Sequence, residues 1–168
     1  MDALADKRKA ELFDFIQKRR LAVVSTNGRS GQPQAALMNI AVLPDLCLIF
    51  ETTCETRKFG NIERDPRIAV VIGWDGQETL QYEGWAERPE GRRLEAVRDA
   101  FIAAFPAKSL DENWPGNSYF VINPCWLRFS SYYRPRFIEE YELADQPRVL
   151  APGWRGWLQR LSGKQPAL

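Results

Sequence analysis

The chain has 168 residues, with 23 basic and 22 acidic side chains and a formal net charge of +1. A chain of this length suits one domain that buries about 70% of its unfolded surface, so we expect a single compact core that needs no disulfide or metal for stability. The balanced charge gives no global field to hold nucleic acid or an anionic membrane, so any anion site must be local.

Histidine is absent from the sequence, and this excludes several reaction classes. An isolated chain without histidine has no Ser-His-Asp or Cys-His nucleophile and no His-ligated zinc or haem. The three cysteines, Cys47, Cys54 and Cys125, have no Cys-x-x-Cys spacing. We therefore expect a reduced, cytoplasmic protein without a metal site. No apolar run has the length of a signal peptide or a bilayer span, so neither export nor membrane insertion is expected.

The first half of the chain predicts one helix followed by short strands. The expected elements are an amphipathic helix at 4–20 and strands at 21–26, 34–43 and 46–52. Asn27-Gly28 is a strong turn signal between the first two strands. Pro44-Asp45 predicts a tight reversal before the third strand, so the three strands are expected to form an antiparallel meander.

The second half mixes two helices with further strands. The expected elements are helices at 57–64 and 89–105 and strands at 67–74, 79–87, 118–122, 126–130 and 137–143. Asp65-Pro66 should end the short helix, and Asn123-Pro124 should separate two strands. Short strands with hairpin turns and few helices indicate a small antiparallel β-barrel.

The C-terminal segment is richer in Pro and Gly and is assigned to a tail. We place the barrel in residues 1–144 and the tail in 145–168. Apolar residues in the tail recur at helical spacing and predict a short amphipathic helix, at Trp154, Trp157, Leu158 and Leu161. The stripe is short, which favours docking on the barrel or on a dimer partner over membrane contact.

The turn before the short helix concentrates polar groups. Thr52, Thr53 and Thr56 supply hydroxyl donors, and Arg57 and Lys58 supply positive charge where a helix exposes its first N–H groups. These groups suit a phosphate monoester, because charge-assisted hydrogen bonds contribute roughly 1.5–3 kcal/mol each. The alternative is that Thr56 is an ordinary N-cap and both cations are solvated, and spacing alone leaves the two interpretations equal.

Two neighbouring features have a functional and a plain interpretation. Cys54 lies in the cationic turn, but no base or resolving cysteine is nearby, which favours a bystander. The strand at 35–41 carries small and apolar residues around Asn39, and a planar ring could stack edge-on against its backbone. A plain core strand is the simpler interpretation.

Four segments, taken in order, resemble the FMN-binding split barrels of the pyridoxamine 5′-phosphate oxidase-like family. They are RRLAVVSTNGRSGQPQAALMNI, LIFETTCETRKFGNIERDPRIAVVIGW, LQYEGWAERP and NPCWLRFSSYYRPRFIEEYEL. The resemblance implies a mainly β (α+β) fold, a six-stranded antiparallel split β-barrel with flanking helices. It also implies a homodimer with FMN at the interface and an FMN-dependent oxidoreductase that acts on an unknown small molecule.

The resemblance implies roles for particular residues. It places the isoalloxazine ring against the backbone of four consecutive residues, Leu37, Met38, Asn39 and Ile40. Glu51 and Thr52 would lie beside the ring and the ribityl chain, and Arg57 and Lys58 would hold the phosphate. Further flavin contacts are implied at Thr79 or Gln81 and at the partner subunit's Tyr141.

Two departures from the family pattern limit what can be transferred. Ala36 stands where the true oxidases carry a phosphate-binding Arg, and the His-containing pattern that grips their substrate is missing. The pyridoxamine phosphate substrate is therefore not transferred, and the lack of His also weakens an analogy to haem-degrading relatives. The alternatives are a non-catalytic flavin-binding or stress-response protein, or a relative that binds the deazaflavin F420.

Overall fold

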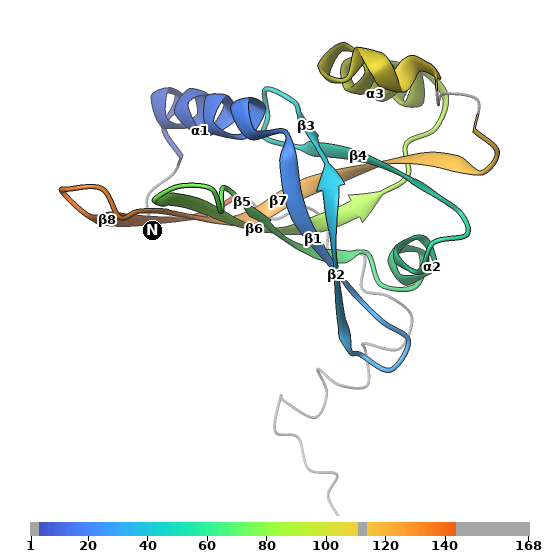
Figure 1. Ribbon diagram of the computed structural model, residues 1–168, viewed down its shortest axis with the longest axis horizontal. Helices are drawn as coiled ribbons and strands as arrows, with labels where there is room; N and C mark the ends of the chain where they lie inside the picture. Colours follow the sequence, from blue (N-terminus) through green and yellow to red (C-terminus); the bar gives the residue numbers. More distant parts are fainter. Residues whose placement is uncertain (1–3, 111–113, 144–168) are drawn as a thin grey trace, which may run out of the picture.

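The computed structural model describes residues 4–110 and 114–143 (Figure 1). The helices are α1 (Asp6–Arg19), α2 (Arg57–Arg64), α3 (Gly91–Ala104) and the 3-10 helix η1 (Pro106–Leu110). The strands are β1 (Leu21–Asn27), β2 (Pro33–Asn39), β3 (Ala41–Val42), β4 (Leu48–Thr53), β5 (Arg67–Ile72), β6 (Glu78–Glu87), β7 (Asn117–Ser131) and β8 (Phe137–Glu142). The three predicted α-helices of the barrel region are confirmed. The amphipathic helix predicted in the tail lies outside the described residues.

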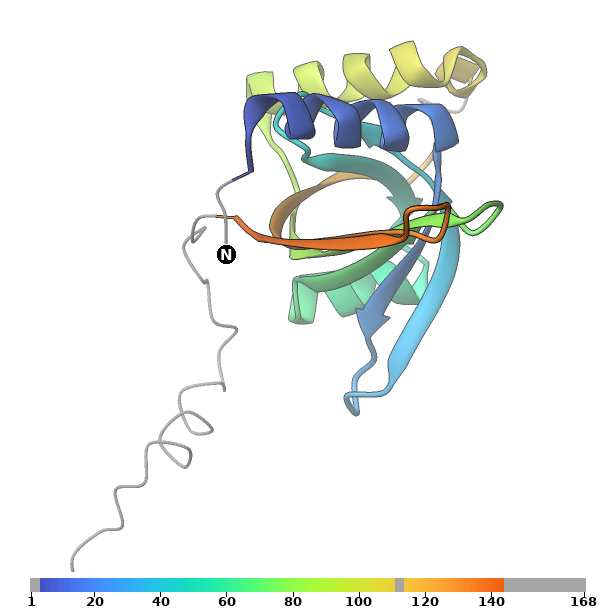
Figure 2. The same ribbon diagram turned by 90° about the vertical axis from the view of Figure 1, so that its left-hand side faces the viewer.

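All eight strands belong to one antiparallel sheet. Its order is β2-β1-β5-β6-β7-β4-β3, and β8 pairs with β7. The sheet curls into a half-barrel, with α1 and α3 above it and α2 below it (Figure 2). The prediction of a mainly β split barrel with flanking helices is confirmed. The sheet has eight strands, whereas the family resemblance implied a six-stranded barrel. Compared with the predicted strand segments, 34–43 is divided into β2 and β3, and 118–122 and 126–130 are joined in β7.

The barrel is open between the two terminal strands of the sheet, β2 and β3. The prediction of one continuous strand at 34–43 is wrong, because β2 ends at Asn39 and the backbone N–H of Ile40 donates to the carbonyl of Arg20 at 2.9 Å. The chain then enters β3, which pairs with β4, and β4 pairs with β7. The antiparallel pairings expected for the first three strands are confirmed between β1 and β2 and between β3 and β4, but they do not form a continuous meander. The chain crosses the open seam at Ile40.

β7 is one strand, although two strands separated by Asn123-Pro124 were predicted. The ladder to β4 ends at Ile122 and the ladder to β8 begins at Trp126, so Pro124 lies between them. On the other side, the register with β6 shifts beside Gly84. Proline is tolerated at such an irregularity because its missing N–H breaks no ladder bond.

Inward side chains of the sheet form the main core. α1 closes one end of the barrel with Leu12, Phe15 and Ile16, all of them buried. The buried hydroxyl of Tyr82 donates to the carbonyl of Ile122 at 2.7 Å. A second cluster packs α3, through Phe101 and its neighbours, on the outer face of β4 and β7. None of the described helices is long and apolar enough to cross a membrane.

Candidate functional site

Two unpaired strand edges and a helix start meet at the barrel seam. β2 is terminal in the sheet and pairs only with β1. In β4, only Leu48 and Ile49 pair with β3, so residues 50–53 pair on the β7 side alone. β2 contacts β4, and α2 contacts both β1 and β4. The seam is therefore bordered by β2, the second half of β4 and the start of α2.

Threonine hydroxyls cap α2 from within the protein. The backbone N–H of Phe59 donates to Oγ1 of Thr56 at 3.3 Å, and that hydroxyl donates to the carbonyl of Thr53 at 3.0 Å. Oγ1 of the buried Thr52 lies 2.9 Å from Oγ1 of Thr56. Because Thr56 has only one proton, Thr52 is the donor in that pair. The N-cap interpretation of Thr56 is confirmed, and both hydroxyl protons are committed inside the chain.

Among the described residues, two N–H groups in the first turn of α2 nevertheless have no acceptor. A helix start leaves four N–H groups without intrahelical acceptors. The N–H of Thr56 donates to the carbonyl of Thr53 at 3.1 Å, and that of Phe59 is bound by the cap. The remaining two belong to Arg57 and Lys58. The donors that the sequence predicted for an anion are thus present as main-chain groups, not as hydroxyls.

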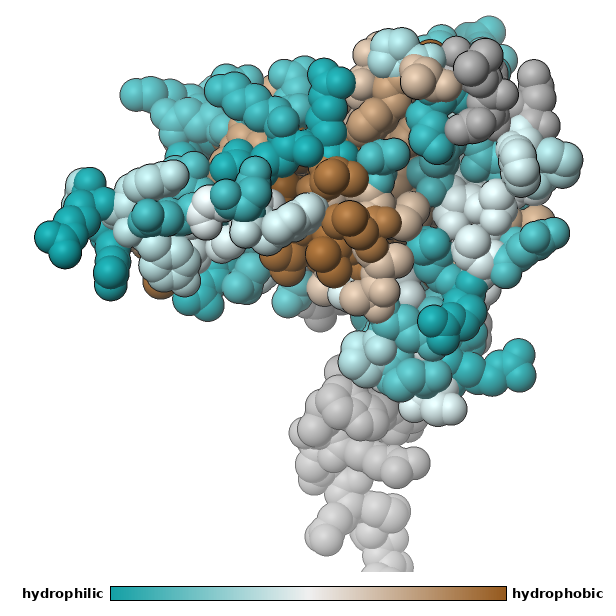
Figure 3. Space-filling view, viewed as in Figure 1, coloured by the Kyte–Doolittle hydropathy of each residue, from teal (hydrophilic) through white to brown (hydrophobic). Residues whose placement is uncertain are grey.

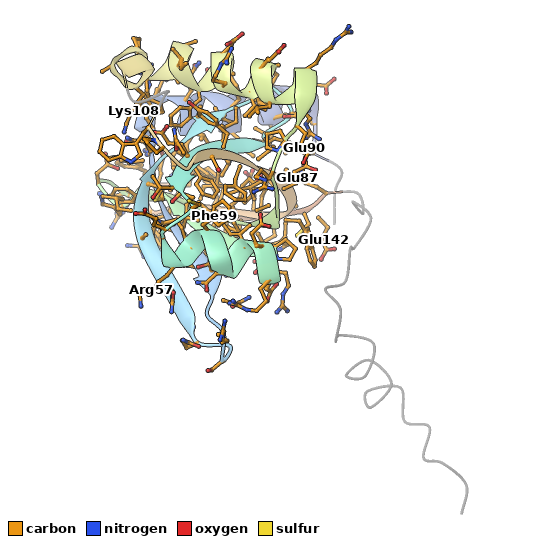
Figure 4. All side chains as sticks on the ribbon, turned by 90° about the vertical axis from the view of Figure 1, so that its right-hand side faces the viewer. Arg57, Phe59, Glu87, Glu90, Lys108 and Glu142 are labelled. Atoms are coloured by element: carbon orange, nitrogen blue, oxygen red, sulfur yellow. The ribbon has the colours of Figure 1, made fainter. Side chains whose placement is uncertain are left out.

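The side chains of Arg57 and Lys58 carry positive charge to the same place. Arg57 is exposed and projects outward from the start of α2 (Figure 4). Lys58 is half-buried, and burial lowers the pKa of its ammonium. Within residues 4–110 and 114–143, neither cation has an ion-pair partner. A partly desolvated lysine beside free N–H groups is the arrangement that a bound anion stabilises.

Glu51 does not face this cationic turn as a free carboxylate. Its side chain is only 12% exposed, and one oxygen lies 3.1 Å from Nζ of Lys108. The other oxygen accepts from Nδ2 of Asn117 at 2.9 Å. Lys108 and Asn117 were not predicted from the sequence, because both are distant from Glu51 along the chain. Lys108 neutralises the carboxylate, and Asn117 supplies a hydrogen bond to its second oxygen.

A buried amide fixes α2 beneath the seam. Nδ2 of Asn61 donates to Oγ1 of Thr26 and to Oε1 of Gln34, both at 3.0 Å, and Arg64 donates to Oδ1 of Asn61. This network joins α2 to β1 and β2. This role of Asn61 was not predicted, although an Asn next to the apolar Ile62 on a short helix is a sequence signal for a buried amide.

The predicted ring-binding segment alternates across β2. Leu37 points outward and is 59% exposed, Met38 packs against the main core, and Ile40 is buried beyond the strand end. The plain core-strand interpretation is therefore wrong for the outward positions. The unpaired edge of β2 offers backbone groups along Leu37 to Asn39, which is the kind of contact predicted for a planar ring.

Two predicted contact residues on β6 lie away from the seam in one chain. Gln81 is on the outer face of β6, aligned with Leu37 through Val23 and Val71, which are their cross-strand partners. Three strand spacings separate it from Leu37, roughly 14 Å. Thr79 is two residues before it on β6. Their role, like that of Glu51 and Thr52 beside a ring, stays a prediction.

Tyr141 lies at the other end of the sheet. It is on β8, opposite Leu127 of β7, and packs against the main core. Burial raises the pKa of its phenol, and Arg8 of α1 partly offsets this increase. The structure of one chain does not bring Tyr141 to the seam, and its predicted contact with a partner's flavin is untested.

The remaining chemistry of the described residues is limited. In the part of the chain that the structure describes, no three His, Cys, Asp or Glu residues cluster as a metal site. Cys54 is exposed in the β4–α2 turn. Cys47 is buried, and burial raises the pKa of its thiol to about 12. The site is therefore best described as a cationic helix start beside an open strand edge.

Comparison with known proteins gives a family match for this chain. The family described as Pyridoxamine 5′-phosphate oxidase matches residues 9–129. No curated protein is detectably similar in sequence.

Solved structures share the fold at low sequence identity. A heme binding protein from Mycobacterium smegmatis is 22% identical with a TM-score of 0.69; the match covers 80% of this chain and 57% of that protein. An FMN binding, pyridoxamine 5′-phosphate oxidase-related protein from Nostoc punctiforme is 15% identical with a TM-score of 0.61, over 83% of this chain and 89% of that one. General Stress Protein 26 from Bacillus anthracis is 23% identical with a TM-score of 0.61, over 80% and 98%.

Proposed function

Since the chain belongs to the pyridoxamine 5′-phosphate oxidase family, we propose that it is an FMN-dependent oxidoreductase whose cofactor phosphate binds at the start of α2. The phosphate would accept hydrogen bonds from the backbone N–H groups of Arg57 and Lys58 and would pair with both side chains. The isoalloxazine ring would lie along the open edge of β2. Bound FMN would supply the electron-transfer chemistry, and the chain would supply placement.

The half-buried ammonium of Lys58 is the observation that carries this proposal. Burying a cation without a partner is unfavourable, and the pKa of Lys58 is lowered for that reason. No carboxylate of the described residues pairs with it, and the nearby Glu51 is held by Lys108. A dianionic phosphate would remove the penalty. Ala36 would provide no additional cation, so the phosphate would depend on Arg57 and Lys58.

We also propose a homodimer that covers the apolar part of the outer face of β2, β1 and β5, at the end of these strands away from the β1–β2 hairpin. α3 covers the outer face of β4 and β7, but this other half of the sheet exposes Leu21, Leu37 and Val71. Figure 3 shows the resulting apolar patch over β1, β2 and β5. Contiguous apolar surface of this kind marks interaction sites. A partner on this face would lie next to the seam and would bring a second set of side chains to it.

Titration of FMN and riboflavin tests the cofactor assignment. The Arg57→Ala/Lys58→Ala variant should bind riboflavin almost as the parent does, because riboflavin lacks the phosphate. Loss of two charge-assisted bonds should weaken FMN binding by roughly 100-fold or more. Lys18→Ala/Arg92→Ala, which removes two exposed cations elsewhere, is the control. A parent protein that is colourless as purified and shows no saturable FMN binding would contradict the proposal.

A flavin-binding protein without turnover is the second candidate. The observation that favours it concerns Glu51, the carboxylate in the part of β4 that borders the seam. It pairs with Lys108 and accepts from Asn117, so it is not available as an acid or base. Anaerobic reduction of the FMN-loaded protein with NADH or NADPH, followed by a screen of electron acceptors, separates the two candidates. Turnover with any acceptor favours the oxidoreductase.

Two other cofactors are compared in the same experiments. Relative affinities for F420 and FMN decide between these two flavins. The mycobacterial relative is a heme binding protein, but this chain has no histidine to ligate haem iron. A Soret band in place of a flavin spectrum would reverse the preference for FMN.

A further inference from the structure

A groove on the outer face of the barrel lies apart from the seam. It consists of two adjoining hollows of about 310 and 270 Å³, which share Asn27 and Arg67. The larger hollow crosses β1, β5 and β6, and the smaller one lies against the β1–β2 hairpin. Figure 3 shows polar surface over this hairpin, below the apolar patch. The groove is therefore distinct from both the α2 start and the exposed apolar patch.

The larger hollow has the shape and lining to hold a flat ring. Trp85 is half-buried in its wall, and the small side chains of Ala69 and Pro33 leave room beside the indole. Gly84 also lines this hollow and adds no side chain to it. Aromatic side chains with small neighbours typically line sites for planar ligands.

The hairpin end of the groove is cationic. Arg29, Arg64 and Arg67 line the smaller hollow against a single carboxylate, that of Asp65. Asp65 pairs with Arg67. Arg64 donates to the carbonyls of Gly60 and Asn27. These uncharged acceptors hold its position and do not neutralise its charge. The local excess of positive charge favours an anion here.

The opposite end carries an acceptor. Glu83 lines the larger hollow and is exposed, and it lies opposite Ala69 in the β5–β6 ladder. β6 is two strands away from β1, a separation of roughly 10 Å. A bicyclic aromatic molecule spans that length.

We propose that this groove is a second binding site and that it takes a planar aromatic molecule with an anionic group at one end and a hydrogen-bond donor at the other. The anion would face Arg29 and Arg64, the ring would lie against Trp85, and the donor would reach Glu83. The site needs no flavin. A molecule bound there would lie one side-chain row away from Leu37, on the same face of the sheet.

Calorimetric titration of the full chain with 6-hydroxy-2-naphthoate tests the proposal. We expect saturable binding with one molecule per chain. 2-Naphthol, which lacks the carboxylate, should bind about tenfold more weakly, because one charge-assisted bond is lost. The difference should shrink in high salt. Absence of binding by the parent protein, or equal affinity for the two probes, would overturn the proposal.

Two variants locate the site. Ala69→Phe fills the groove from an exposed position and should abolish binding of the probe, whereas FMN affinity should stay unchanged. Arg29→Ala should weaken the probe severalfold, and Arg92→Ala on α3 should have no effect. Arg29 is an exposed loop residue, so this variant should remain folded if Ala69→Phe does not. Parent-like probe binding in Arg29→Ala, or in a folded Ala69→Phe, would overturn the proposal without bearing on FMN.

Discussion

Nζ of Lys108 lies 3.1 Å from a carboxylate oxygen of Glu51, and this ion pair fastens η1 to the end of β4. Lys108→Met should remove the cation from the poorly exposed carboxylate of Glu51 and leave the hydrogen bond from Asn117. We expect a loss of roughly 1 kcal/mol, because Lys108 is itself 34% exposed and part of the pair is screened. That loss corresponds to a decrease in Tm of about 2–4 °C.

Thermal unfolding of a double-mutant cycle measures this pair. Adding Glu51→Gln to Lys108→Met should restore most of the lost stability, because no unpaired charge remains. Lys18→Met on the exposed side of α1 is the matched control. Additive effects of the two substitutions would show that the pair contributes nothing.

Asn61 should be the most sensitive polar position of α2. Asn61→Leu keeps the approximate volume but removes the bonds to Thr26, Gln34 and Arg64. It leaves the buried Thr26 hydroxyl without its donor, so we expect a loss of about 2–3 kcal/mol. Denaturant unfolding measures it, with Gln17→Leu on the exposed face of α1 as the control. Equal stability of the two variants would contradict the prediction.

The sequence predicts most accurately the elements that local chemistry determines. α2 has the predicted bounds because Thr56 caps it and Pro66 follows its last residues. The break at Ile40 was missed, since the two flanking strands pair with different partners and only tertiary structure separates them. The predicted break at Pro124 was wrong for a related reason. Pro124 is compatible with β7 because the ladders to β4 and β8 end on either side of it.

The candidate site also contains residues that local sequence predicts and residues that only tertiary structure brings together. The cationic turn could be predicted, because Arg57 and Lys58 are adjacent to the residues that start the helix. The partners of Glu51 and Asn61 could not, because they come from distant strands and from η1. The hydroxyls of Thr52 and Thr56 were assigned to a ligand, but both are used in the cap of α2.

Asp65 should make stability depend on pH in the acid range. The pKa of its carboxyl is lowered from 3.8, mainly because Arg67 donates to it, with a further bond from Asn27. A folded pKa below the unfolded one stabilises the protein fully above about pH 4, and that contribution is lost as pH falls through the folded pKa. Asp65→Asn should therefore show a smaller decrease in Tm between pH 7 and pH 3 than the parent protein.

The exposure of Arg67 limits the size of that effect. Arg67 is 39% exposed, so solvent screens part of the interaction. Asp14→Asn, on the exposed side of α1, should retain the parent's acid sensitivity. If Asp65→Asn loses as much stability in acid as Asp14→Asn does, the Asp65–Arg67 pair is not the source.

Cys54 and Cys47 should react very differently with a thiol reagent. Cys54 is exposed in the β4–α2 turn, whereas Cys47 is buried and its pKa is raised to about 12, first by burial and then by the charge of Asp45. Because the thiolate is the reactive form, Cys47 should stay unlabelled in the folded protein at pH 8. Labelling with 5,5′-dithiobis(2-nitrobenzoate) should give a fast phase that Cys54→Ser removes.

FMN should slow the fast phase, because the proposed phosphate site lies within a few residues of Cys54. Riboflavin at the same occupancy should protect less. Protection by neither compound, at concentrations that saturate flavin binding, would place the phosphate elsewhere.

Leu37 should control association of the chain with a second copy. Its side chain is 59% exposed at the centre of the apolar patch, beside Val23 and close to Val71. Leu37→Glu places a charge where the proposed partner would bury it, and an unpaired buried charge is strongly unfavourable. We expect a monomer in sedimentation velocity where the parent is a dimer. Leu94→Glu, on an exposed part of α3 under the same conditions, should remain dimeric. FMN affinity should fall with dimerisation in Leu37→Glu if the partner completes the site, and a monomeric parent protein would refute the proposed interface.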